Sequence, residues 1–220
     1  MKSQQSGFTL VEIAIVLVII GLLLGGILKG QELINSAKVK NLANDFRVIP
    51  TYIYAFQDKF KALPGDDAQV VAHVTGSTVA TPAGTLGNGV INGHWNDASG
   101  TNETFLFWQH VRLANLAAGS TDPAVVAEYQ PRNAVGGILG VSSLATGQPH
   151  ITGMSGSYQV CSKGILGKFA KQLDIQMDDG NTQTGSMRTV LDTAAIGTAS
   201  PAMSATFPDD SITHTVCMVF

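Results

Sequence analysis

The feature that most constrains this chain is an apolar run near its beginning. Residues 13–28 contain no charged side chain, and the apolar character extends back to Phe8, with Glu12 as the single carboxylate. A helix needs roughly 20 apolar residues to cross a bilayer, so the segment is long enough to span one. The sequence therefore predicts a membrane-length helix at the start of the chain.

Glu12 is the unusual residue of this apolar run. A carboxylate in a membrane-spanning helix costs on the order of 2.5–3.5 kcal/mol on insertion scales, so it indicates a functional site by default. A buried carboxylate without a partner is expensive, whereas a nearby opposite charge keeps it ionised. Glu12 is therefore expected to have a positively charged partner.

Residues 6–12 read Ser-Gly-Phe-Thr-Leu-Val-Glu and lead directly into the apolar run. This pattern resembles the prepilin signal of type IV pilins and type II secretion pseudopilins. The resemblance implies that a membrane peptidase cuts after Gly7 and methylates the new amino terminus at Phe8. It also implies that Glu12 meets the positive amino terminus of a neighbouring subunit in a filament. An amino terminus at Phe8 would lie about one helical turn from Glu12.

Two simpler interpretations fit this segment less well. A secretory signal peptide has a 7–15-residue apolar core and an Ala-x-Ala-like cut site, whereas this core is longer, is followed by no such site and contains Glu12. A plain membrane anchor accounts for the length but not for Gly7-Phe8 or the carboxylate. Cut site, carboxylate position and helix length agree, which favours the prepilin interpretation.

The pattern becomes amphipathic after Lys29. Apolar residues recur at steps of three and four, and polar residues occupy the opposite face, as in a helix with one buried stripe. We therefore predict one long helix from Phe8 to about Phe60, which Pro50 is able to kink. The apolar series comprises Val39, Leu42, Phe46, Ile49, Ile53, Phe56, Phe60 and Leu63.

The sequence Ala-Leu-Pro-Gly-Asp at residues 62–66 is expected to end the long helix. Residues before proline avoid the helical region, and Pro-Gly is a turn signal. This element also resembles one found in a subset of prepilin-type proteins. Asp66 and Asp67 have two open interpretations, as caps of the turn or as ligands of a cation.

The remaining residues, 63–220, are expected to form one globular head of the α+β class with an antiparallel sheet, as in pilins. The chain of 220 residues has room for one such domain beside the helix. Charged residues make up 13% of the chain, about half the usual share. The net charge of −3 provides no basic field for nucleic acid.

Within the head, a helix is expected from about Asn102 to Ala118, with Thr101 or Asn102 as its cap. Trp108 and His110 on this helix are interpreted as packing residues, with a binding pocket as the alternative. No element is assigned between residues 122 and 152. The other predicted elements are a strand at 157–161, a short helix at 166–175, a strand at 187–191 and a terminal strand at 214–220.

Cys161 and Cys217 are the two cysteines of the chain. In an exported protein, two cysteines suggest one disulfide, and two buried free thiols are the alternative. The resembling family often closes its C-terminal region with such a bond. A cross-link over more than about 50 residues is expected to contribute about 4 kcal/mol in the chain-entropy model.

The sequence does not favour catalysis. It contains no Gly-x-Ser-x-Gly motif, and its five histidines are isolated and lack the spacing of metal ligands. We therefore expect no enzymatic activity.

Calcium is the one cofactor that the sequence suggests. Asp178, Asp179 and Asn181 place oxygen atoms around a glycine turn, as hard cations require, although the order differs from an EF-hand. Some pseudopilins bind calcium in a loop of this region, so the resemblance adds support for a calcium site here. The sequence favours a solvated turn, with the calcium site as the alternative.

Taken with the resemblance, the sequence predicts a structural subunit of a type IV pilus that supports adhesion, motility or DNA uptake. The alternatives are a type II secretion pseudopilin and a membrane-anchored binding module.

The expected divisions are a leader at 1–7, a helix at 8–62 and the head at 63–220, with 8–28 as the membrane or filament segment and 29–62 as the amphipathic part. Expected partners are copies of the chain, other pilins, the prepilin peptidase and an inner-membrane assembly platform. The chain is expected in the bacterial inner membrane first, then in an extracellular pilus or a periplasmic pseudopilus.

Overall fold

The computed structural model describes residues 7, 9–81, 85–98, 100–144, 150–202, 204 and 207–220. Phe8, the predicted methylation position, and residues 1–6 of the predicted leader lie outside the described residues. The chain divides into two compact units, residues 1–38 and residues 39–220, which are described separately.

A single helix, α1, runs from Leu10 to Phe60 over 51 residues and confirms the predicted long N-terminal helix. In the first unit its apolar side chains are exposed, from Leu10 at 86% to Ile34 at 58%. The pattern changes at Val39, where the buried stripe of the second unit begins. A helix that is apolar on all sides needs apolar surroundings, and the chain itself provides them only from Val39 onward.

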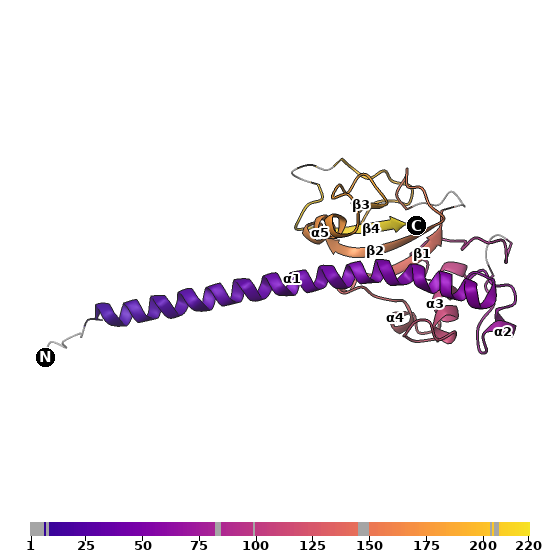
Figure 1. The fold of residues 1–220 in the computed structure, drawn as a ribbon, viewed down its shortest axis with the longest axis horizontal. Helices are drawn as coiled ribbons and strands as arrows, with labels where there is room; N and C mark the ends of the chain where they lie inside the picture. The colour runs from indigo at the N-terminus through magenta and orange to yellow at the C-terminus, as the bar shows by residue number, and fades with distance from the viewer. Residues whose placement is uncertain are drawn as a thin grey trace. The chain divides into compact units, whose positions relative to one another are not determined.

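The second unit contains a four-stranded antiparallel sheet in the order β1-β2-β4-β3, which confirms the predicted α+β class. The fifth helix, α5, packs against β2, β3 and β4, and the third helix, α3, packs against β1 (Figure 1). The strands are β1 (Leu139–Ser143), β2 (Tyr158–Leu166), β3 (Met187–Leu191) and β4 (Thr213–Val219). The further helices are α2 (Val70–His73), α3 (Glu103–Leu113), α4 (Val126–Tyr129) and α5 (Gly167–Met177).

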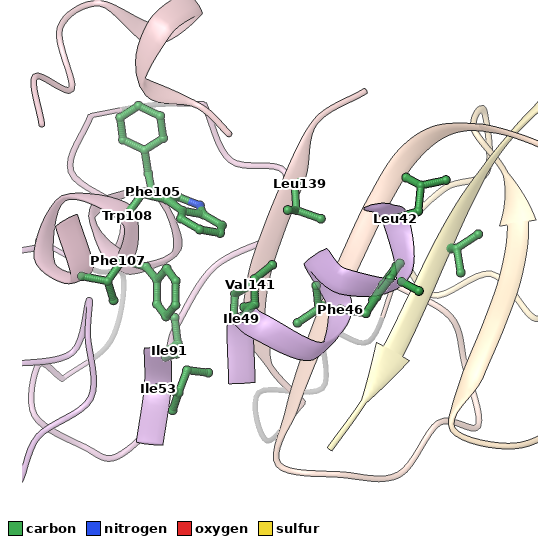
Figure 2. Close-up of a cluster of buried hydrophobic side chains, with 14 of the residues drawn as sticks. Leu42, Phe46, Ile49, Ile53, Ile91, Phe105, Phe107, Trp108, Leu139 and Val141 are labelled. Carbon is green, nitrogen blue, oxygen red and sulfur yellow. The ribbon is translucent and has the colours of Figure 1, made fainter. Parts of the chain in front are cut away.

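The core of the second unit forms where the buried stripe of α1 meets α3 and the sheet (Figure 2). Leu42, Phe46 and Ile53 are fully buried, as the apolar period of three and four predicts. Burial of each such side chain contributes about 1.5–3 kcal/mol relative to exposure. The partners of the stripe in this cluster include Ile91, Phe105, Phe107, Trp108, Leu139 and Val141.

The prediction for α3 was right at its start and wrong at its C-terminal end. The helix ends at Leu113 rather than Ala118, because Asn115 adopts a left-handed backbone conformation (φ 62°) that stops it before Gly119. Asn102 occupies the N-cap position, yet its side chain donates to Asp97 instead of capping the helix.

The prediction for β3 is confirmed at both ends and that for β4 to within one residue, whereas one strand is longer than predicted and another was not predicted. The strand predicted at residues 157–161 runs from Tyr158 to Leu166, because a register shift between Ser162 and Ile165 lets it continue along β4. Leu139–Ser143, for which no element was predicted, pairs with β2 as the edge strand β1. Its burial on both faces removes the alternation by which sequence patterns identify a strand.

The predicted disulfide is present. Cys161 on β2 and Cys217 on β4 are register partners and are joined by a bond of 2.04 Å. Both residues are fully buried in a small second cluster with Trp95 and Ile151. The bond links the two central strands of the sheet across 56 residues of chain.

Candidate functional site

Thr9 and Glu12 form a reciprocal contact at the start of α1. One carboxylate oxygen of Glu12 accepts from the Thr9 backbone N–H at 2.8 Å and from the Thr9 hydroxyl at 2.7 Å. The Glu12 backbone N–H in turn donates to the Thr9 hydroxyl oxygen at 3.3 Å. This is a capping box, which satisfies N–H groups that a helix start leaves without partners.

Sequence reasoning missed this contact, although Thr-x-x-Glu before an apolar run is its known signature. The capping box gives Glu12 a role within its own chain, since it orients the carboxylate at the first turn of α1. Glu12 is exposed and forms no ion pair with another described residue. The carboxylate therefore remains accessible to a positive group from outside the described chain.

Gly7, the predicted cleavage position, is exposed. A Cβ atom added at Gly7 would meet no atom within 4 Å. The fold of the described chain therefore does not require a glycine at this position. A requirement for glycine would have to come from an external partner such as a peptidase.

The exposed part of α1 is the largest apolar surface of the described chain. It includes a window long and apolar enough to cross a membrane by length and composition, and none of that window is buried within the chain. Apolar surface of this extent indicates contact with lipid or with other proteins. The accessible Glu12 and Gly7 lie at the beginning of this surface.

Comparison with known families identifies the N-terminal segment. Residues 2–28 match the model of the prokaryotic N-terminal methylation motif. No curated protein and no solved structure matches the chain. The chain thus carries a prepilin-type signal, which is typical of type IV pilins and type II pseudopilins. Together with its helix and sheet, this makes it a pilin- or pseudopilin-like protein.

The loop that follows α5 has its own network of hydrogen bonds. Asp178 accepts from the Met187 backbone N–H at 2.7 Å and from the Ser186 hydroxyl at 3.2 Å. Asp179 accepts from the Thr184 hydroxyl at 2.6 Å and from the Asn181 backbone N–H at 2.8 Å. These contacts hold both carboxylates at the beginning of the loop.

The structure groups these two carboxylates with a third one, Asp174, which the sequence interpretation missed. One oxygen of each of Asp174, Asp178 and Asp179 lies within 4.8 Å of the others. The signal was the four-residue spacing of Asp174 and Asp178, which places both on one face of a helix. The side-chain oxygen of Asn181, predicted as a ligand, accepts from the Gln183 N–H at 3.2 Å.

Asp174 is fully buried, and neither of its carboxylate oxygens has a hydrogen-bond partner. Burial, together with the negative charges of Asp178 and Asp179, raises its pKa to about 6, against the opposing effect of the nearby N–H groups of Gly180 and Asn181. A buried carboxylate whose oxygens lack hydrogen bonds of good geometry is costly. A cation placed among the three carboxylates would remove that cost.

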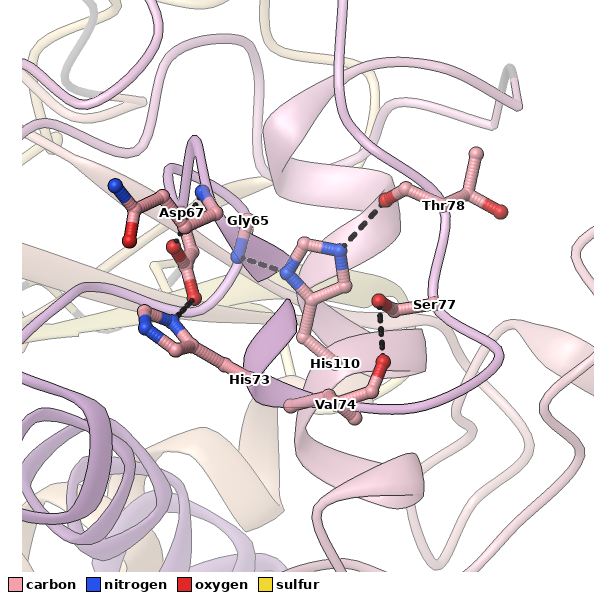
Figure 3. Close-up of polar contacts among 8 residues, drawn as sticks. Gly65, Asp67, His73, Val74, Ser77, Thr78 and His110 are labelled. Carbon is pink, nitrogen blue, oxygen red and sulfur yellow. Dashed lines mark hydrogen bonds and ion pairs between the residues drawn. The ribbon is translucent and has the colours of Figure 1, made fainter. Parts of the chain in front are cut away.

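The A-L-P-G-D turn is tied to α3 through His110. The backbone N–H of Gly65 donates to Nδ1 of His110 at 2.9 Å, and Nε2 lies 2.9 Å from the carbonyl oxygen of Thr78 (Figure 3). Since Nδ1 accepts, Nε2 carries the proton and the ring is neutral. Burial lowers the pKa of His110, which favours this neutral form. His110 therefore has a structural role, as the packing interpretation predicted.

Asp66 and Asp67 accept hydrogen bonds from the chain itself. Asp67 accepts from the Gln69 N–H at 2.8 Å and contacts Nδ1 of His73 at 2.7 Å (Figure 3). Asp66 binds the backbone of residues 87–89. These bonds favour the interpretation of both residues as caps over that of cation ligands. An open cleft of about 450 Å³ lies beside this turn, lined in part by Phe60, Asp67 and His73.

Proposed function

We propose that this chain is a structural subunit of a type IV pilus, cut after Gly7 and methylated at Phe8 before assembly. The observation that carries the proposal is the exposed apolar part of α1, most of which lies within the matched methylation motif. Such a helix is stable in a bilayer before assembly and in the core of a filament afterwards, because both surround it with apolar groups. Assembly exchanges lipid contacts for contacts with neighbouring helices.

Glu12 would fix the register in which neighbouring subunits pack in the filament. In the proposed filament its carboxylate meets the amino terminus at Phe8 of a neighbouring subunit, which provides the opposite charge that a buried carboxylate needs. The capping box with Thr9 holds the same carboxylate at the first turn of α1. The free subunit is therefore arranged to receive the incoming amine.

The proposed division of the chain follows from this role. Residues 1–7 are the leader, residues 8–62 the helix with its membrane or filament segment at 8–28, and residues 63–220 the head. The subunit starts in the inner membrane, where it meets the prepilin peptidase and an assembly platform. There it joins other pilins in a filament that extends outside the cell. Its role is structural rather than enzymatic, in support of adhesion, motility or DNA uptake. A pseudopilin of a type II secretion system is the alternative, with the same chemistry in a periplasmic filament.

The cleavage step is tested by Gly7→Val. The added side chain is expected to slow cleavage by co-expressed prepilin peptidase at least about tenfold, which corresponds to 1.36 kcal/mol in the barrier. Because Gly7 lies in open space, the substitution leaves the fold unchanged. The cleaved fraction is measured by mass spectrometry of the intact chain. Gly21→Ala, at another glycine in open space, is the control and should be cut normally. Equal cleavage of Gly7→Val would contradict the assignment.

We also propose that the head binds one calcium ion through Asp174, Asp178 and Asp179. The buried and unpartnered carboxylate of Asp174 carries this proposal. Carboxylate oxygens are ligands that calcium prefers. When bound, the ion would supply positive charge that links the C-terminal part of α5 to the loop before β3.

Calcium is expected to stabilise the head, by about 2.7 kcal/mol at a free concentration one hundred times the dissociation constant. Asp174→Asn removes one anionic ligand and should weaken binding at least about tenfold, or 1.4 kcal/mol. Both effects are measured on the full chain in detergent, by thermal unfolding and by calorimetric titration with calcium chloride. Glu128→Gln, at an exposed carboxylate, should bind as the unchanged protein does. Absence of binding heat, or equal affinity in Asp174→Asn, would overturn the proposal.

A further inference from the structure

Two buried carboxylates from distant parts of the chain hold one short segment of the head, residues 87–92, which we call the clasped segment. The first is Asp66 of the A-L-P-G-D turn, which is 3% exposed. Its oxygens accept from the backbone N–H groups of Gly87 at 2.5 Å, Asn88 at 3.2 Å and Gly89 at 2.7 Å. Three donors thus complement the negative charge of Asp66.

The second carboxylate is Glu103, in the first turn of α3, which is fully buried. One oxygen, Oε2, accepts from the backbone N–H of Asn92 at 2.5 Å and from its side-chain amide at 3.0 Å. The other oxygen, Oε1, is buried and has no hydrogen-bond partner. The two ends of the clasped segment are therefore attached to two different acids.

The backbone at Gly65 brings these two acids together. A Cβ atom at Gly65 would lie 2.5 Å from the carbonyl oxygen of Glu103, so the A-L-P-G-D turn lies directly against the start of α3. Gly65 also has a φ of 93°, which only glycine adopts readily. Close packing at this point leaves no room for a water layer between the turn and the helix.

Few groups near Glu103 are able to compensate a negative charge. No lysine or arginine of the described chain forms an ion pair with Glu103 or Asp66. His110, on α3, is neutral because its Nδ1 accepts from Gly65, and His73 pairs with Asp67. Asp97, in the loop before α3, adds another carboxylate on this side of the head.

We propose that a proton on Glu103 keeps the clasped segment closed and that loss of the proton frees residues 87–90 and Asn92 from the two acids. Ile91 between them stays fully buried in the core, where its backbone is bonded to Ser143. In the protonated form, Glu103 is neutral beside the anionic Asp66, and its Oε2 still accepts from Asn92. In the ionised form, Oε1 is a buried anion without a donor and faces a second anion. Opening of the segment admits water to both carboxylates and relieves that cost.

The direction of the pH dependence follows from Glu103. Burial is the largest cause that raises its pKa, and Asp66 adds to the rise, which brings the pKa from 4.5 to about 7. The closed clasp thus binds a proton that the open segment releases. Its stability is complete below pH 4.5 and is lost as the pH rises through about 7. Because Gly87 and Gly89 line the cleft beside the turn, release alters the wall of that cleft.

Hydrogen exchange of the full chain in detergent micelles tests the proposal. After correction for intrinsic exchange, protection of the amides of residues 87–90 and 92 should fall at least about tenfold between about pH 5.5 and 8.5. The amide of Ile91, which donates to buried Ser143, should stay protected. Amides of β4 should keep their protection over the same range. Equal protection of the clasped segment at both pH values would overturn the proposal, as would a loss shared with β4.

The substitution Glu103→Gln removes the titratable carboxylate and keeps the size and shape of the side chain. The amide oxygen still accepts from Asn92 but carries no charge, so the segment should stay protected at the higher pH. A variant that keeps the pH dependence of the unchanged protein would contradict the role of Glu103. Glu128→Gln, at an exposed acid, is the matched control and should keep the full dependence. If Glu103→Gln loses β4 protection and is therefore unfolded, the comparison of segment and β4 in the unchanged protein decides the question.

Discussion

Replacement of Glu12 by glutamine is expected to abolish filament assembly while the chain still enters the membrane. In the proposed filament, the substitution leaves the amino terminus of a neighbouring subunit buried without an opposite charge. Removal of one partner from a buried ion pair costs about 3–5 kcal/mol. Since every subunit contact of the filament repeats this loss, assembled material should fall below detection. The measurement is electron microscopy and quantification of filaments sheared from cells.

The choice of glutamine separates the two roles of Glu12. Glutamine preserves the capping box with Thr9, because both Glu and Gln serve at this position, whereas Glu12→Ala removes the cap and the charge together. Loss of assembly in both variants therefore assigns the effect to the charge. Glu32→Gln, at an exposed acid of the same helix that pairs with Lys29, is the control and should assemble normally.

The opposite result is expected if the protein is a membrane anchor that never polymerises. Removal of a carboxylate from a membrane helix saves about 2.5–3.5 kcal/mol on insertion scales, so a plain anchor should be unaffected or improved. Normal filaments built from Glu12→Gln would also contradict the proposed pairing. Glu12→Gln therefore distinguishes the proposed filament from a plain anchor and from a filament in which Glu12 forms no ion pair.

Loss of the disulfide should have the largest effect on the stability of the head. The double substitution Cys161→Ala, Cys217→Ala opens a loop across 56 residues and is expected to lower the free energy of unfolding by about 4 kcal/mol. Alanine is used because both positions are fully buried and a serine hydroxyl would have to be desolvated there. Denaturant unfolding of the full chain in detergent measures the change.

The single variant Cys217→Ala provides the control for packing. It opens the same loop but keeps the Cys161 side chain among Trp95 and Ile151, so its loss should be close to that of the double variant. A loss below about 1 kcal/mol in both variants would show that the bond does little to restrict the unfolded chain.

The sequence predicted those parts of the fold whose periodicity reflects burial on one side. The stripe of Leu42, Phe46 and Ile53 gave α1 its helical pattern, and that stripe is buried. By contrast, β1 was not predicted because it is buried on both faces and has no alternation. The extension of β2 depends on a register shift against β4, which no local pattern encodes.

The candidate site residues also differ in whether a local sequence pattern identifies them. Glu12 and Gly7 belong to a compact local motif, and residues 2–28 indeed match a known methylation motif. Asp174 and Glu103 were not predicted as site residues. Both are fully buried by segments distant in the sequence. Sequence patterns identify acids, but tertiary packing decides which of them lose contact with water.

The most direct test of the central claim is mass spectrometry of filaments sheared from cells, combined with electron microscopy of the same material. We expect surface filaments built from a chain that begins at methylated Phe8. A chain with the same mature terminus that stays in the cell envelope would instead identify a pseudopilin. A chain that still begins at Met1, in cells without filaments, would contradict the account.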